Sequence, residues 1–236
     1  MIAAHQTMLA PQGAPLGSVA FSGASGSNLF YQNASQPTVY TMSCWAKSAS
    51  SSTHGCYVKV GVKDGEYGSD VRGSGVGFGV GGSSFGNDGS NMIVLREGVA
   101  YEVSGAIPGA SSWHHYAVSV NGRSVYAYID GALVKSSSNT VYTFATCYTY
   151  FGGYASGSNR WWAGEMTRCA MWNRVLSASE IATDYADGKN APTTTNGLDH
   201  FWPMSSADNY LADAVGSATL TAGTGGVTIS TDTPFA

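Results

Sequence analysis

Charge is scarce in this sequence, and long apolar runs are absent. Asp, Glu, Lys and Arg make up 11% of the 236 residues, against about 25% in typical soluble domains. The formal net charge is −4 and no stretch concentrates lysine or arginine, which argues against a protein that binds nucleic acid by neutralising phosphates. No stretch approaches the ~18 consecutive apolar residues that would cross a bilayer. We therefore expect neither a nucleic acid nor a membrane as a partner.

The sequence also lacks two short signals. The first six residues, Met1 to Gln6, have neither the basic start nor the apolar core of a secretory signal, so we expect synthesis in a cytoplasm. The cysteines form no CxxC motif, which argues against a zinc site. In a reducing compartment we expect them to be buried thiols, whereas in a secreted chain they would allow disulfides with three alternative connectivities. The four cysteines are Cys44, Cys56, Cys147 and Cys169.

Glycine is abundant, with 31 residues set between short β-branched and aromatic runs. Such runs, separated by turn residues, are typical of an antiparallel all-β protein. The alternation of glycine with larger residues in 76–80 predicts a strand that another backbone approaches closely. No βαβ rhythm appears, so we predict two antiparallel sheets in one domain. The predicted strands are 17–21, 28–32, 39–46, 56–60, 76–80, 92–95, 115–120, 125–129, 132–134, 198–203, 218–221 and 226–229.

Two local motifs predict a turn and a helix. Asp130 and Gly131 form the strongest short hairpin signal, inside a three-stranded meander over 113–134. Ser177 and Glu180 form an S-x-x-E capping box, which predicts that a short helix begins there. Gly188 is placed to end that helix as its C′ residue.

Two longer blocks carry a family pattern. The first is WHHYAV at 113–118 leading to YIDG at 128–131, and the second combines FGG at 151–153, WAGEM at 162–166 and MWNRVLSASEI at 171–181. Over about residues 17–190 they resemble the laminin-G-like (concanavalin A-like lectin/glucanase) superfamily. The resemblance implies a jelly-roll sandwich of two curved antiparallel sheets with one short helix, whose concave face or rim loops commonly bind carbohydrate. We expect this domain to span 17–236, after an irregular arm at 1–16.

The sequence argues against catalysis. A retaining glycosidase needs two carboxylates about 5 Å apart, and the related glucanases place them on one strand as E-x-D-x-x-E. The matching strand here holds one acid, Glu165. Thr167 and Arg168 stand where the family usually has an Asp-Glu pair, which also weakens the case for a metal there. We predict no catalytic residue.

Two further groups are candidate metal ligands. His114 and His115 are adjacent, so on a strand they face opposite sides and do not chelate one ion together; we predict structural roles. The loop from Asp64 to Asp70 offers several oxygen ligands that suit calcium, but its spacing matches no motif. We predict a solvated acidic turn and no cofactor, with calcium as the alternative.

One surface patch is a candidate for sugar binding. Trp161 and Trp162 follow a polar turn, and strand alternation would send one ring inward and the other outward. An exposed ring beside polar side chains would stack on a sugar, whereas the alternative is that both rings lie in the core or in a subunit contact. The candidate residues are Tyr154, Asn159, Arg160, Trp161 and Trp162.

Three functions follow, in decreasing order of expectation. The first is a non-enzymatic virion-surface or assembly protein, such as a capsid decoration or fibre-associated protein. It is favoured because the chain lacks a signal and has a surface poor in charge. Its partners would be further structural subunits, as a homo-oligomer or with capsid or tail proteins, together with glycans. The second is a carbohydrate-binding module of a bacterial surface or secreted protein, and the third is a glycoside hydrolase.

Overall fold

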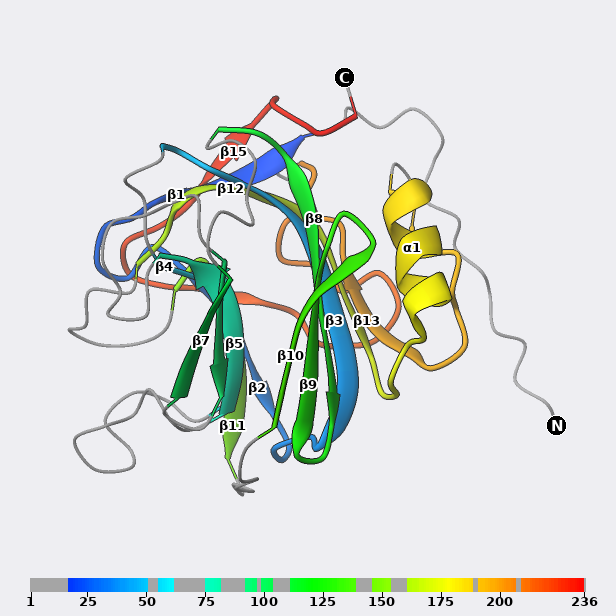
Figure 1. Cartoon of the computed structure of the whole chain (residues 1–236). Helices are drawn as coiled ribbons and strands as arrows, with labels where there is room; N and C mark the ends of the chain where they lie inside the picture. The colour runs from blue at the N-terminus through cyan, green and yellow to red at the C-terminus, as the bar shows by residue number, and fades with distance from the viewer. Residues whose placement is uncertain are drawn as a thin grey trace, which may run out of the picture.

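The computed structural model describes residues 17–50, 55–61, 75–81, 92–96, 99–103, 111–138, 146–153, 161–188, 191–206 and 209–235. Within these ranges the chain forms fifteen strands and one helix (Figure 1). The elements are β1 (Ser18–Ser22), β2 (Leu29–Asn33), β3 (Val39–Ser48), β4 (Gly55–Gly61), β5 (Gly75–Val80), β6 (Met92–Arg96), β7 (Val99–Val103), β8 (His114–Asn121), β9 (Ser124–Ile129), β10 (Ala132–Ser138), β11 (Cys147–Phe151), β12 (Ala163–Trp172), α1 (Ala178–Ala186), β13 (Leu198–Trp202), β14 (Thr221–Ala222) and β15 (Thr228–Ser230).

The described strands form two antiparallel sheets. Sheet A has the order β10-β9-β8-β3-β12-β1-β15, with β13 also paired to β12. Sheet B has the order β14-β2-β11-β4-β5-β6-β7. The predicted all-β sandwich with one short helix is therefore confirmed. The predicted arm at 1–16 lies outside the described residues.

Strand β12 changes its neighbour along its length. Its first half pairs with β1, where Val19 lies opposite Met166, and its second half pairs with β13, where Cys169 lies opposite Trp202. Between the halves, the register with β3 shifts between Thr167 and Ala170. A β-bulge therefore lies at the centre of sheet A, and such irregularities re-aim side chains.

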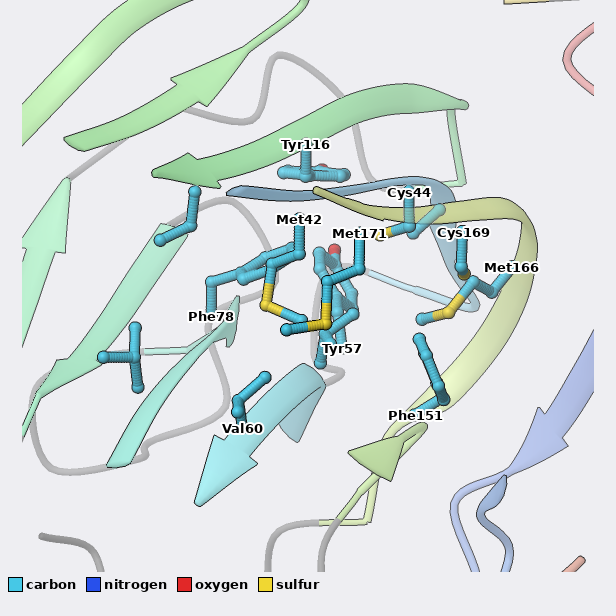
Figure 2. Close-up of a cluster of buried hydrophobic side chains, with 14 of the residues drawn as sticks. Met42, Cys44, Tyr57, Val60, Phe78, Tyr116, Phe151, Met166, Cys169 and Met171 are labelled. Carbon is cyan, nitrogen blue, oxygen red and sulfur yellow. The ribbon is translucent and has the colours of Figure 1, made fainter. Parts of the chain in front are cut away.

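The main core lies between the facing sides of the two sheets. Met42 and Met171 of sheet A meet Tyr57 and Phe78 of sheet B, and all four are at most 5% exposed (Figure 2). The core is rich in sulfur because cysteines and methionines fill irregular gaps. The buried thiols are Cys44, Cys147 and Cys169, which are free. The prediction of buried thiols is thus confirmed for these three, and the side chain of Cys56 lies outside the description.

Helix α1 covers the outer face of sheet A. Leu176 and Ile181 pack against Ala170 and Trp172 of β12 in a second apolar cluster, and Figure 1 shows the helix on the side of β3 and β13, away from β5 and β7. Sheet A therefore packs against the main core on one face and against α1 on the other.

Within the described residues no helix has the length and apolar character to cross a bilayer.

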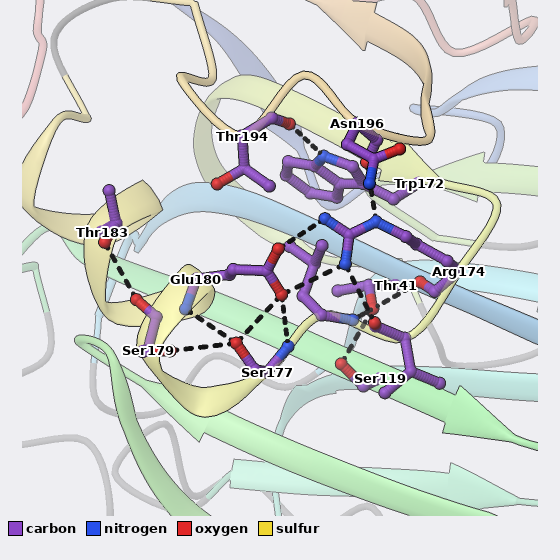
Figure 3. A network of polar contacts seen from close by, with 12 residues as sticks. Thr41, Ser119, Trp172, Arg174, Ser177, Ser179, Glu180, Thr183, Thr194 and Asn196 are labelled. Atoms are coloured by element: carbon purple, nitrogen blue, oxygen red, sulfur yellow. Dashed lines mark hydrogen bonds and ion pairs between the residues drawn. The ribbon is translucent and has the colours of Figure 1, made fainter.

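The predicted helix start is confirmed. Ser177 is the N-cap: its side chain accepts a hydrogen bond from the Glu180 amide, and the Glu180 carboxylate accepts one from the Ser177 amide (Figure 3). The prediction for the helix end is right in position but not in reason. Gly188 follows the C-cap Asp187, yet it does not adopt a positive φ. A Cβ at Gly188 would lie 2.6 Å from Nε1 of Trp45, so close packing explains this glycine.

Candidate functional site

Three aromatic side chains lie together on the outer face of sheet B, which faces away from the core. They are Phe30 of β2 and Tyr148 and Tyr150 of β11. The alternation of a strand sends their neighbours Leu29 and Phe151 into the core. We call Phe30, Tyr148 and Tyr150 the aromatic patch.

The rings of the aromatic patch contact one another. Tyr148 and Tyr150 stack with centroids 5.5 Å apart and ring planes 30° apart. Phe30 lies 6.3 Å from Tyr148 and 6.0 Å from Tyr150. Tyr150 is 3% exposed, whereas Phe30 and Tyr148 are half-buried. The rings of Phe30 and Tyr148 are therefore partly accessible to solvent, and the buried ring of Tyr150 packs against both of them.

Polar side chains border the aromatic patch. Gln32 lies opposite Tyr148 in the ladder and is exposed, and Lys59 of β4 lies opposite Tyr150. Strands β2, β4 and β11 contain no aspartate or glutamate. An apolar platform with a few polar groups beside it is the usual composition of a site for a small organic ligand. The aromatic patch suits stacking on the C–H face of a sugar better than acid–base chemistry.

Of the five residues predicted for sugar binding, the structure describes two, Trp161 and Trp162. Tyr154, Asn159 and Arg160 lie outside the described residues, and Trp161 is half-buried, so their roles stay predictions. The prediction for Trp162 is wrong. Its side chain is fully buried, its ring lies 4.7 Å from that of Tyr57, and its Nε1 donates to Oγ of Ser48 at 3.2 Å. A ring enclosed in the core has no face for a sugar, and apolar burial decides its position.

Sequence reasoning missed the aromatic patch because both faces of its strands are apolar. In β11 the outer positions 148 and 150 are tyrosines, and the inner positions are Cys147, Thr149 and Phe151. No clean alternation of apolar and polar residues separates the two faces. The available signal was the pair of tyrosines two positions apart, which share a face of any strand.

Glu165, the acid weighed for catalysis, is bound in a cluster on sheet A. Nζ of Lys47 lies 2.7 Å from Oε2 of Glu165 and also pairs with Asp232. Nε1 of Trp113 donates to Oδ1 of Asp232 at 2.9 Å. The hydrogen bond from Lys47, together with that from Trp113, lowers the pKa of Asp232. Asp232 is therefore ionised at neutral pH, which does not suit the proton donor of a glycosidase.

The two adjacent histidines face opposite sides, as predicted. Nδ1 of His114 lies 2.7 Å from Oδ2 of Asp130, and Nε2 of His115 lies 3.1 Å from Oδ2 of Asp184. The same oxygen of Asp184 accepts a hydrogen bond from Oγ of Ser43 at 2.8 Å. The carboxylate therefore stands between serine and histidine. In a nucleophilic triad the histidine must contact the serine, so this network serves to hold α1 on sheet A.

The predicted calcium loop, Asp64 to Asp70, lies outside the described residues. Across the part of the chain that is described, no three His, Cys, Asp or Glu side chains come together in a group that would hold a metal ion. The solvated acidic turn expected there stays a prediction, with calcium binding as its alternative.

Comparison with solved structures supports the fold. A native heptameric SAP-like pentraxin from Limulus polyphemus is 12% identical, with a TM-score of 0.62, and the match covers 92% of this chain and 95% of that one. A candidate carbohydrate-binding protein from Bacteroides ovatus is 16% identical, with a TM-score of 0.62, and the match covers 94% of this chain and 60% of that one. At these identities the likeness shows the fold alone. No curated protein matches this chain.

A family comparison assigns the chain more directly. The model of the concanavalin A-like lectin/glucanases superfamily matches residues 22–182. This range contains the last residue of β1 and all of β2 to β12, and it ends within α1. The chain belongs to the concanavalin A-like lectin/glucanase superfamily.

Proposed function

We propose that this protein is a non-enzymatic carbohydrate-binding domain that binds a neutral sugar on the aromatic patch. The observation that carries the proposal is the group of three contacting rings, Phe30, Tyr148 and Tyr150, on the outer face of sheet B. Aromatic faces bury the apolar C–H surface of a ligand, and phenol hydroxyls hydrogen-bond to its polar groups.

Lys59 lies opposite Tyr150 but is only 3% exposed, so the polar group that the aromatic patch presents beside it is the neutral side chain of Gln32, which favours a neutral ligand. Gln32 is exposed beside it and offers both an amide donor and a carbonyl acceptor. The strands that carry and border the patch hold no acid. The family match and the similar Bacteroides ovatus protein support carbohydrate binding over the virion-surface role.

A glycan array tests this function. We expect the wild-type protein to bind one or more neutral glycans, and Tyr148→Ala to weaken binding about tenfold, which corresponds to about 1.4 kcal/mol. Tyr126→Ala is the matched control because Tyr126 is also a half-buried tyrosine but lies on sheet A, packed in the cluster beneath α1. Failure of the wild-type protein to bind any glycan, or unchanged binding by Tyr148→Ala, would reject the proposal.

Absence of catalysis is part of the proposal. Lys47 pairs with both Glu165 and Asp232, so these neighbouring carboxylates share one cation. We expect no release of reducing sugar from any glycan that the array identifies. Release that Glu165→Gln abolishes would contradict the proposal and restore the glycosidase hypothesis.

The virion-surface role stays a prediction from the low charge of the sequence. Neither the matched family nor the two similar structures bears on a virion. The presence of the chain in stoichiometric amounts in purified particles would support that role. The molar mass in solution, measured by light scattering, would test the expected homo-oligomer.

A further inference from the structure

Arg168 occupies an unusual position in the middle of β12. It lies in the bulge between the two halves of the strand, where the register with β3 shifts. Its φ is +51°, a region that non-glycine residues seldom adopt. The amide of Arg168 donates to the carbonyl of Pro203 at 3.0 Å, which holds the backbone in this conformation. Bulges and such backbone conformations recur where a side chain must point in one required direction.

Among the described residues, the guanidinium of Arg168 has an aromatic neighbour but no negative partner. Its Cζ lies 4.8 Å from the centroid of the Phe235 ring. Its Nε is buried and has no hydrogen-bond partner, although the residue as a whole is half-buried. Burial lowers the pKa of Arg168 to about 10. Within the described ranges no carboxylate pairs with this group, although buried charges in proteins are usually paired.

The nearest acids along the chain are already bound to other groups. Glu165 lies three positions before Arg168 and pairs with Lys47. Asp232 lies three positions before Phe235 and pairs with Lys47 and with Nε1 of Trp113. Lys47 therefore holds both of these carboxylates, and among the described residues neither of them pairs with the Arg168 guanidinium.

We propose that Arg168 and Phe235 form a binding site for a carboxylate ligand. The two terminal nitrogens of a guanidinium present a planar fork that matches the two oxygens of a carboxylate. Partial burial strengthens this contact because the group has lost part of its hydration. A single cation beside an aromatic wall matches the single charge and planar shape of a carboxylate. The site lies on sheet A, whereas the aromatic patch lies on sheet B. The experiments below therefore test this site independently of the proposed function.

Arginine side-chain NMR on the whole chain tests this site. In protein labelled with ¹⁵N-arginine, the Nε–H signals are followed at pH 7 during titration with sodium acetate and, separately, with sodium chloride at the same ionic strength. We expect the chemical shift of the Arg168 Nε–H signal to change saturably with acetate. We expect chloride to bind at least about tenfold more weakly than acetate. A non-saturating shift, or equal effects of the two salts, would overturn the proposal.

Three variants sharpen the test. Arg168→Gln should abolish saturable acetate binding, measured by calorimetry, and Arg168→Lys should weaken it, because lysine keeps the charge but loses the fork. Arg123→Gln is the matched control, since Arg123 is an exposed arginine in the β8–β9 turn, and it should bind acetate as the wild type does. Acetate binding that survives in Arg168→Gln would overturn the assignment, and the wild-type titration remains decisive if this variant does not fold.

A last titration distinguishes the source of the carboxylate. Sodium glucuronate carries the same group on a sugar ring. Binding about tenfold tighter than that of acetate would support the site and assign a sugar acid as its ligand. Equal binding would support the site for a simple carboxylate group, without a contribution from the ring.

Discussion

Nδ1 of His200 lies 2.7 Å from Oδ2 of Asp213, and the same contact joins His114 to Asp130, also at 2.7 Å. In both pairs the second carboxylate oxygen accepts a hydrogen bond from the amide of the residue after the histidine, at 3.0 Å and 2.9 Å respectively. One His–Asp arrangement thus stabilises two chain reversals, the turn between β9 and β10 and the loop after β13. We infer that the histidines within the described residues, His114, His115 and His200, serve the architecture of the domain.

The first prediction concerns acid stability and Asp213. Its side chain is 1% exposed and also accepts hydrogen bonds from the amides of Val215, Gly216 and Ala218. Burial alone would raise the pKa of Asp213, but the bonds from His200 and the backbone hold this pKa well below its usual range. A lowered pKa stabilises the folded state above the unfolded value, about 4, and this contribution is lost as the pH falls below it.

We expect Asp213→Asn to lower the free energy of unfolding at pH 7 by about 2–4 kcal/mol, measured by urea denaturation. Between pH 5 and pH 2.5, roughly the range where carboxylates titrate, the variant should lose less further stability than the wild type. Asp199→Asn is the control because Asp199 is an exposed acid beside the same histidine, with 51% of its side chain exposed. If the free energy of unfolding of Asp213→Asn fell as steeply between pH 5 and pH 2.5 as that of the wild type, the assignment would be contradicted.

Much of the fold could be predicted because its local signals agree with one another. The Asp130-Gly131 turn adopts positive φ at both residues, 49° and 78°, as a two-residue hairpin requires. Directly before the predicted glycine-rich strand 76–80, which the structure forms as part of β5, a Cβ on Gly75 would lie 2.1 Å from the carbonyl oxygen of Val60. These signals depend on a few neighbouring residues and on backbone geometry, so they are visible in the sequence.

The candidate sites depend on contacts that sequence patterns do not carry. Trp161 and Trp162 are chemically identical neighbours, and only the packing of Phe21 and Tyr57 around one of them decides which ring is lost to the core. Likewise, Lys47 is distant in sequence from Glu165 and Asp232 and yet binds both, and within the described residues neither acid pairs with Arg168. Tertiary packing settles such choices, and the sequence leaves both outcomes open.

The second prediction concerns the helix cap. Oγ of Ser177 accepts the Glu180 amide at 3.2 Å, while the Glu180 carboxylate binds Arg174 at 3.1 and 2.5 Å (Figure 3). Ser177→Ala should cost about 1 kcal/mol of stability, the usual loss for an N-cap serine. This corresponds to a Tm lower by about 2–4 °C for a chain of this size. Ser112→Ala, at an exposed serine, should leave Tm unchanged, and equal Tm values for the two variants would contradict the role of the cap.

The third prediction concerns thiol reactivity. Burial raises the pKa of Cys147 to about 11 and raises that of Cys169 well above its usual range. Because the thiolate is the reactive form, both should resist iodoacetamide at pH 8 in the native protein, as should buried Cys44. Mass spectrometry after digestion should show their alkylation once the protein is unfolded in urea. Rapid alkylation of any of the three in the folded state would show that the core opens far more often than its packing indicates.

The fourth prediction separates the two neighbouring tryptophans. Trp162→Ala should lower the free energy of unfolding by about 3–5 kcal/mol, as removal of a buried aromatic ring does, whereas Trp161→Ala should cost less than about 1 kcal/mol. Trp162→Phe keeps most of the buried volume and loses the hydrogen bond to Ser48. If it folds, we expect it to bind glycans as the wild type does, measured on the same array as Tyr148→Ala. A folded Trp162→Phe variant that has lost glycan binding would mean that Trp162 reaches the ligand after all, and that the aromatic patch of sheet B is not the whole site.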